Sequence, residues 1–109
     1  MVRTYRDLVV WQKSMCLVTN IYETTKPFPR DEMFGLATQM RRCAVSIPSN
    51  IAEGFGRKGT GDFLRFLSIS IGSLFELQTQ IEIAMNLGYI NTKVYEKIFT
   101  SSREIERML

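Results

Sequence analysis

The stretch GFGRKG at residues 54–59 matches the glycine pattern G-x-G-x-x-G, which is used elsewhere to cradle phosphates. That pattern binds a dinucleotide when it follows a β-strand and opens a helix within a parallel sheet. Here the preceding residues have helical periodicity, and the chain offers no strand partner for such a sheet. A P-loop is excluded as well, because Gly59 is followed by Thr60 and not by lysine. We therefore interpret these glycines as a turn between two helices.

The cations in and around this stretch could still bind a phosphate group. Arg57 and Lys58 lie beside flexible backbone near the start of the next expected helix, where free N–H groups favour an anion. Residues 41–65 hold five cations against Glu53 and Asp62, whereas residues 66–92 hold two acids and no cation. This asymmetry favours a polyanion partner on one side of the molecule. The nucleic-acid-binding residues that we predict are Arg41, Arg42, Arg57, Lys58 and Arg65. Ordinary surface charge, or a salt bridge between subunits to Glu53 or Glu76, accounts for the same arginines.

Other kinds of chemistry have little support in the sequence. The chain has no histidine, which removes the Ser-His-Asp and Cys-His catalytic arrangements. Two cysteines cannot close a tetrahedral zinc site. The remaining metal hypothesis is a carboxylate cluster of Glu53, Glu76 and Glu82, but their spacing does not require it. We expect no catalytic residue, no metal and no cofactor.

The composition is that of a globular protein. The 109 residues are 45% hydrophobic and 23% charged, with a net charge of +3, and we expect one domain over residues 1–109. No signal peptide is recognisable at the start, and the most apolar segment, residues 66–75, is too short to span a membrane. Cys16 and Cys43 are expected to be buried thiols in a reducing cytoplasm.

The apolar residues recur with helical spacing in four segments. We expect helices over residues 7–25, 31–55 and 62–87, and a fourth from Asn91 or Thr92 onward, capped by one of these two residues. Short connections predict an all-α, antiparallel up-down-up-down four-helix bundle. The apolar stripe of the second helix keeps its phase through Pro48, so we predict a kinked but continuous helix. Gly54 or Gly56 is expected to end it in a left-handed conformation.

The first helix is apolar in two directions. One stripe contains Leu8, Trp11, Met15, Val18 and Tyr22, and a second contains Val10, Leu17 and Ile21. Either the helix presents one wide face to the core, or one stripe faces the core and the other faces a second subunit. The third helix is the most apolar of the four. The oligomer-interface residues that we predict are Val10, Leu17, Ile21, Ile71 and Phe75.

Three segments of the chain resemble successive blocks of a known bacterial family. They are DLVVWQKSMCLVTNIYETTKPFP (7–29), LATQMRRCAVSIPSNIAEGFGR (36–57) and FLRFLSISIGSLFELQTQIEIAMNLGYI (63–90). The family is that of four-helix-bundle proteins encoded in intervening sequences of large-subunit ribosomal RNA genes. A related branch is the accessory variability protein of diversity-generating retroelements. The resemblance implies a homopentameric ring with a central channel, nucleic-acid binding in the retroelement branch, and a reverse transcriptase as partner of that branch.

The sequence and the resemblance together suggest a function. We expect a non-enzymatic homopentamer that binds RNA or DNA non-specifically, because five copies multiply the net charge of +3 on each chain. Arg41, Arg42 and Arg57 lie at matched positions of the resemblance. The alternative is a purely structural scaffold that recruits a protein partner such as a reverse transcriptase. Trp11 is interpreted as a core or interface anchor, with a platform for stacking bases as the alternative.

Overall fold

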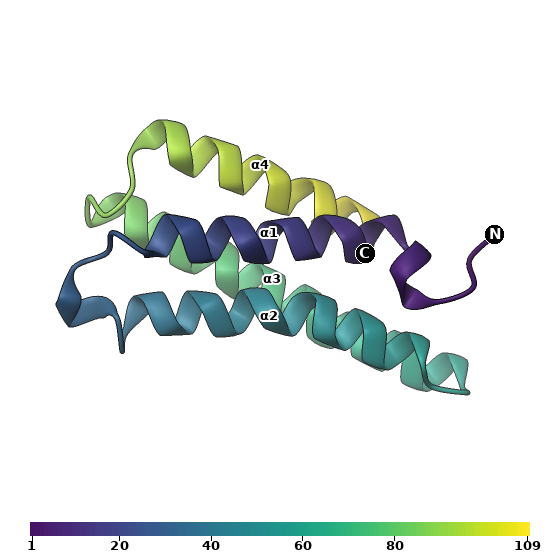
Figure 1. Cartoon of the computed structure of the whole chain (residues 1–109). Helices are drawn as coiled ribbons and strands as arrows, with labels where there is room; N and C mark the ends of the chain where they lie inside the picture. The colour runs from purple at the N-terminus through teal and green to yellow at the C-terminus, as the bar shows by residue number, and fades with distance from the viewer.

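The computed structural model describes all 109 residues, and it consists of four antiparallel α-helices (Figure 1). The helices are α1 (Val9–Thr25), α2 (Leu36–Phe55), α3 (Thr60–Asn86) and α4 (Thr92–Met108). Two 3-10 helices, η1 (Tyr5–Asp7) and η2 (Arg30–Glu32), precede α1 and α2. Each helix packs against the next and α4 packs back against α1, so the four form a closed cycle around one core. The predicted all-α four-helix bundle is confirmed.

The helices differ in length, and this difference shapes one end of the molecule. α3 has 27 residues and α2 has 20, whereas α1 and α4 have 17 each. At 1.5 Å per residue α3 is about 40 Å long and α4 about 25 Å. The α2–α3 hairpin therefore projects past the end of α4, at the lower right of Figure 1. We call residues 53–66 the hairpin tip. None of the four helices has the length and apolar character needed to cross a membrane.

The helix ends have identifiable causes. Asn91 caps α4 by accepting a hydrogen bond from the Val94 N–H at 2.8 Å, as predicted. Gly88, which follows α3, has a φ of 78°, the left-handed conformation that glycine adopts without strain. The prediction that Gly54 or Gly56 would adopt this conformation is wrong, because Gly88 alone has positive φ. Gly54 lies inside α2, where an added Cβ would come 2.8 Å from the Cβ of Phe66. The close approach of α3 therefore requires glycine at this position.

α2 continues through Pro48 to Phe55, so the continuous helix predicted from its periodicity is confirmed. The proline ring is buried, and the helix keeps one apolar face through this point, with Ile47 and Ile51 fully enclosed. A nearby bond links the two long helices, because the Ser70 hydroxyl of α3 donates to the Ile47 carbonyl at 3.0 Å. The kink at Pro48 stays a prediction.

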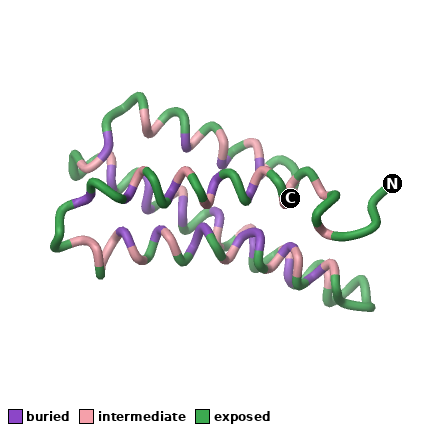
Figure 2. The backbone as a smooth tube through the Cα atoms, in the orientation of Figure 1, coloured by how far each residue is buried: buried purple, intermediate pink, exposed green.

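The core lies on the inward faces of all four helices, where Figure 2 shows the buried positions. Its fully enclosed apolar side chains include Met40 and Ile47 of α2 and Leu74 and Leu77 of α3. Hydroxyl groups share this interior, and each has a hydrogen-bond partner. Ser14 donates to the Val10 carbonyl at 2.7 Å. Such local bonds allow small polar residues to occupy core positions at little cost.

The stripe of α1 that we predicted to face another subunit faces the core of the single chain instead. Leu17 is 1% exposed and Ile21 is 0% exposed, so both belong to the core of the single chain. Their assignment to an oligomer interface is wrong, because α2 and α4 already enclose this side of α1. Val10 packs half-buried against the same core. The stripe that the bundle leaves partly uncovered is the other one, in which Met15 is 43% exposed.

Candidate nucleic-acid interface

The five predicted nucleic-acid-binding residues separate into two groups. Arg57, Lys58 and Arg65 lie in the hairpin tip, at the projecting end of the bundle. Arg41 and Arg42 lie in the N-terminal half of α2, where 13 residues, about 20 Å of helix, separate Arg42 from the end of α2 at Phe55. The sequence predicted one basic sector, and the structure instead contains two sites with different surroundings.

The hairpin tip holds two guanidinium groups over one aromatic ring. The Cζ atoms of Arg57 and Arg65 lie 4.9 Å and 4.8 Å from the ring centroid of Phe66, within the range of cation–π contacts. Arg57 also pairs with Glu53 at 2.6 Å, and Arg65 lies 3.8 Å from Asp62. Both pairs are exposed to solvent, where such ion pairs contribute at most about 1 kcal/mol. A phosphate group can therefore compete with these carboxylates at low energetic cost.

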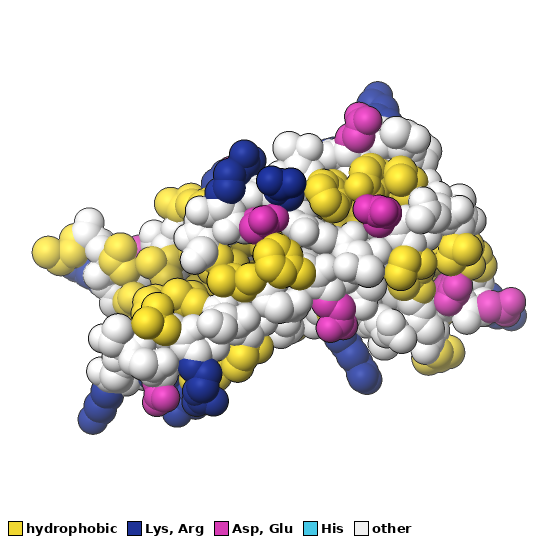
Figure 3. Space-filling view, turned by 180° about the vertical axis from the view of Figure 1, so that it is seen from behind, with side chains coloured by type: hydrophobic (Ala, Val, Ile, Leu, Met, Phe, Trp, Pro, Cys, Tyr) yellow, Lys and Arg dark blue, Asp and Glu magenta, His cyan; other side chains and the backbone are white.

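The turn between α2 and α3 adds to this basic character. Lys58 is exposed and has no ion-pair partner in the chain. α3 begins after Gly59, which provides no side-chain hydrogen bond to the first turn. The view from behind in Figure 3 shows basic side chains projecting from this end of the molecule, at the lower left.

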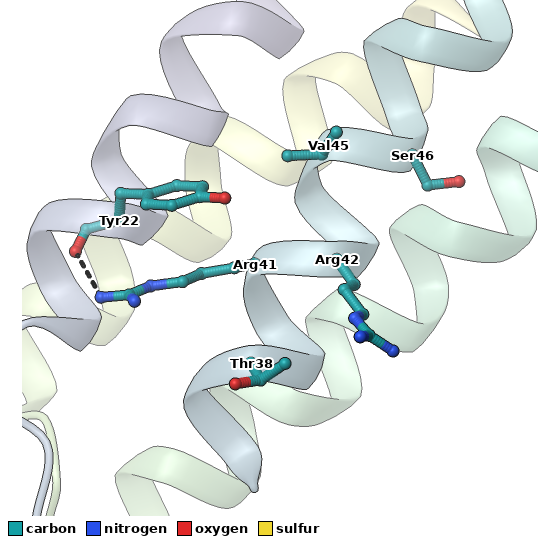
Figure 4. Close-up of a pocket in the computed structure, with 6 residues that line it drawn as sticks. All are labelled: Tyr22, Thr38, Arg41, Arg42, Val45 and Ser46. Carbon is teal, nitrogen blue, oxygen red and sulfur yellow. Dashed lines mark hydrogen bonds between the residues drawn. The ribbon is translucent and has the colours of Figure 1, made fainter. Parts of the chain in front are cut away.

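Arg41 is held within the chain by α1. Its Nε donates to the Thr25 hydroxyl at 2.8 Å, and one Nη lies 3.4 Å from the Tyr22 carbonyl oxygen. The guanidinium also lies over the Tyr22 ring, with Cζ 4.9 Å from the centroid. Figure 4 shows the side chain reaching from α2 to α1 along one side of a pocket of about 460 Å³. Arg41 is thus an anchored cation with part of its guanidinium open to the pocket.

Arg42 differs from Arg41 although the two are adjacent. Its side chain points toward the α3 side of α2, away from Arg41 (Figure 4), and it is exposed. Within one chain Arg42 makes no salt bridge to Glu53, which pairs with Arg57, and the alternative of a bridge between subunits to Glu53 or Glu76 stays a prediction. The carboxylate of Glu76 instead accepts a hydrogen bond from the Cys43 thiol at 2.9 Å. Neither Arg41 nor Arg42 has a carboxylate partner in the bundle.

The polar groups between α2 and α3 include a buried thiol and carboxylates that do not come together as a metal site. Burial, together with the hydrogen bond to the Glu76 carboxylate, raises the pKa of Cys43 to about 12, so the thiol is protonated and unreactive near neutral pH. Cys16 is exposed, which corrects the expectation that both thiols are buried. No three His, Cys, Asp or Glu side chains come together in a way that could hold a metal ion. The proposed cluster of Glu53, Glu76 and Glu82 is therefore not formed.

Sequence reasoning missed two aromatic residues that position the arginines. The sequence places Tyr22 in an apolar stripe and Phe66 in the most apolar segment, whereas the Tyr22 ring also lies beneath one guanidinium group and the Phe66 ring beneath two. Arg65 directly precedes Phe66, which was a weak signal, but the approach of Arg57 depends on the geometry of the turn. Trp11 is half-buried and contacts Tyr5 edge-to-face at 5.1 Å between centroids, which is compatible with an anchor.

The fold defines a class: small antiparallel four-helix bundles in which a long central hairpin projects past the other two helices. Within that class, the chain belongs to the 23S rRNA-intervening sequence protein family, whose model matches residues 6–109.

A solved structure supports this assignment. The chain is similar to the crystal structure of a protein with unknown function from the S23 ribosomal protein family of Bacteroides thetaiotaomicron VPI-5482. The TM-score is 0.83 at 27% sequence identity, over 92% of this chain and 94% of the other. No curated protein matches the chain.

Proposed function

We propose that the protein is a non-enzymatic homo-oligomer, assembled as a pentameric ring, that binds RNA or DNA non-specifically through phosphate contacts. The proposed binding of nucleic acid rests on the arrangement of side chains at the hairpin tip. Two arginines held over Phe66, beside the unpaired Lys58, form a compact basic surface at the projecting end of the bundle. Arginine and lysine at such a surface bind phosphates without reading sequence.

Assembly strengthens this proposal because it repeats the tip. In a ring whose axis runs along the bundle, every copy points the same way and all tips lie on one rim. A polymer then contacts several tips at once, and the counterions released from its phosphates add to the binding free energy. The apolar side chains that one bundle leaves exposed, among them Leu64 at 55% and Phe75 at 46%, support self-association.

A salt titration of nucleic-acid binding tests this function. Binding of a fluorescent 20-nucleotide RNA and of a duplex DNA is followed by anisotropy between 50 and 300 mM salt. We expect binding at low salt that weakens steeply as salt increases. The triple variant Arg57→Gln, Lys58→Gln, Arg65→Gln should bind at least tenfold more weakly and show a shallower salt dependence.

The matched control removes three cations far from the hairpin tip. Lys26→Gln, Lys93→Gln and Lys97→Gln change the net charge by the same amount, and all three lysines are exposed. We expect the control to lose much less affinity than the tip variant. No binding by the native protein at 50 mM salt, or equal losses in both triple variants, would contradict the proposed interface.

A scaffold that recruits a protein, such as a reverse transcriptase, is the second candidate function. The observation that favours it is Phe34, whose side chain is 97% exposed before α2, at the end opposite the hairpin tip. Exposed aromatic side chains are frequent anchors of protein interfaces. Retention of a purified reverse transcriptase by the native protein and its loss in Phe34→Ala would support this function over nucleic-acid binding.

A further inference from the structure

Two uncovered apolar surfaces lie on opposite sides of the bundle. The first is a groove between α1 and α2, of about 330 Å³, which we call the groove face. Its lining includes no charged side chain, and it consists of Tyr5, Trp11, Met15, Val18, Val45, Pro48, Ser49 and Ala52. Met15 is 43% exposed and Val45 is 40% exposed although both are apolar. A groove of this kind requires a covering partner to remove its apolar surface from water.

The second surface lies on α3 and exists because α4 is shorter. Gln78 of α3 hydrogen-bonds Ser102 and Glu106 at 3.1 Å each, and α4 ends two residues later at Met108. The α3 residues that precede Gln78 on the same side of the helix therefore have no α4 beside them. They form what we call the shelf, which consists of Leu64, Leu67, Ile71 and Phe75. Figure 3 shows hydrophobic side chains gathered over α3 toward the tip end.

The two surfaces are placed so that copies can join head to tail. The groove face lies on the α1/α2 side and the shelf on the α3/α4 side, and these are opposite sides of the closed four-helix cycle. A contact between unlike surfaces of identical copies closes into a ring when the rotation allows it. Around an axis parallel to the helices, the α3 of one copy runs in the same direction as the α1 of its neighbour.

The charges beyond each surface match this parallel arrangement. Glu82 is an exposed acid toward the C-terminal end of α3, seven residues after Phe75 and on the same side of the helix. Residues 66–92 contain no cation. Toward the C-terminal end of α1, Val45 of the groove face also lines a second pocket, which contains Tyr22, Arg41 and Arg42 and no acidic residue. Eleven residues, about 16 Å of helix, separate Ile71 from Glu82 and also Trp11 from Tyr22.

We propose that the shelf of one copy packs into the groove face of the next, parallel to its α1, and brings Glu82 to Arg41. This inference rests on the proposed self-assembly and adds the two surfaces, their direction and the ion pair. Arg41 suits the role because Thr25 and Tyr22 already hold its guanidinium at the end of the groove, with N–H groups left to donate. The neighbour's carboxylate supplies the partner that this arginine lacks within one chain.

Two variants test the proposal, each of which introduces a charge into one of the two apolar surfaces. Val45→Glu alters the groove face and Leu64→Glu alters the shelf, and both positions are exposed enough to leave the fold intact. By light scattering, the native chain should be a multiple of 12.6 kDa, and each variant alone should be monomeric. An equimolar mixture should form a dimer, because one intact groove face then meets one intact shelf. Phe34→Glu, outside both surfaces, serves as the control and should assemble like the native chain.

The outcomes separate this inference from the proposed function. A native chain that stays monomeric at all concentrations overturns the self-assembly and this inference together. A native assembly that persists in either variant, or a mixture that stays monomeric while circular dichroism shows folded helices, overturns the two surfaces alone. The nucleic-acid titration compares the tip variant with its control at one assembly state, so it tests the phosphate contacts separately.

The direction of packing has its own test. Glu82→Arg should weaken self-association at least tenfold at low salt, because the new cation faces Arg41, and Arg41→Glu in the same chain should restore it. Glu96→Arg, an exposed change on α4, is the matched control and should leave assembly unchanged. A loss in Glu82→Arg no larger than in this control overturns the parallel arrangement.

Discussion

The inner and outer faces of α1 have similar apolar patterns and very different environments. On the inner face Ser14 and Leu17 are 1% exposed, and Ile21 and Thr25 are 0% exposed. On the outer face Met15 and Tyr22 remain 43% and 42% exposed. The outer stripe contains more apolar residues, yet the inner one forms the core. The number of apolar residues in a stripe thus does not determine which stripe a bundle encloses.

The types of residue on each face account for this difference. Trp, Tyr and Met are large or flexible side chains that are common at protein interfaces, where one end or one side remains accessible. The inner face combines branched aliphatic residues with small hydroxyl residues that bond to their own helix, as Thr25 does with the Ile21 carbonyl at 2.8 Å. Small residues allow neighbouring helices to approach closely, whereas the tryptophan and tyrosine side chains of the outer stripe would keep a neighbouring helix farther away.

The largest effect that we expect comes from truncating the inner face. Ile21→Ala should lower the free energy of unfolding by about 2–5 kcal/mol, because it leaves a cavity in a fully enclosed site. Met15→Ala, the matched change on the outer face, should cost about 1 kcal/mol or less in the isolated chain. Urea denaturation at low protein concentration measures both. Equal costs would remove the distinction between the two faces.

A smaller effect is expected at the end of the inner face. Thr25→Val keeps the shape but removes the acceptor for Arg41 Nε, so the free energy of unfolding should fall by about 1–3 kcal/mol. Thr24→Val, on the same turn and only half-buried, is the control and should change stability by less than about 0.5 kcal/mol. Thermal unfolding followed by circular dichroism compares them. A Thr25 variant as stable as the control would contradict a structural role for the Arg41 bond.

The two cysteines should differ in thiol reactivity because one is exposed and the other is buried. Cys16 is exposed on α1 and Cys43 is buried on α2, where its pKa is raised from 9.0 to about 12 by burial and by Glu76. A thiol reagent at pH 8 should therefore modify one thiol per folded chain rapidly and the other only on unfolding.

The same pKa sets a pH dependence of stability. Between pH 9 and 12 the folded chain keeps a proton on Cys43 that the unfolded chain loses, so stability should decline as pH rises through this window. The variant Cys43→Ala should show a smaller decline over the same window. Two equally fast thiols, or the same decline in both proteins, would contradict this account.

The smallest effect is expected for Ser14→Ala. The hydroxyl bonds only to the Val10 carbonyl of its own helix, and alanine has a helix propensity about 0.5 kcal/mol more favourable. The two contributions nearly cancel, so stability should change by less than about 0.5 kcal/mol despite full burial. A loss above 1 kcal/mol in urea denaturation would mean that this hydroxyl stabilises the inner face through a contact outside α1.

Much of the fold was predictable because it depends on local patterns. The helical period, the Asn91 cap and the continuity through Pro48 all follow from residues that are close in sequence. The choice between the faces of α1 was not predictable, because it depends on which neighbours pack against it. The prediction of a left-handed Gly54 was wrong for a related reason. The backbone at Gly54 is ordinary helix, and glycine is required there because Phe66 of the next helix packs closely against it.

The candidate site was predictable in its residue types and less so in its geometry. The sequence identifies the five cations, but their separation into a group at the hairpin tip and a group in the N-terminal half of α2 depends on the length of α2. The anchoring of Arg41 to Thr25 spans 16 residues and requires α1 and α2 to be side by side. Contacts of this range follow from the packing of helices and leave no signal in the periodicity of either one.

The short turn between the two longest helices has a consequence for folding. α2 and α3 meet across only four residues, 56–59, so the entropic cost of bringing them together is small. Contacts between neighbours in sequence form early in helical proteins, and we expect this hairpin to form before α1 and α4 dock. Hydrogen exchange in the native state should then be slowest in the middle of α2 and α3, and the last segments to close should be the two terminal helices.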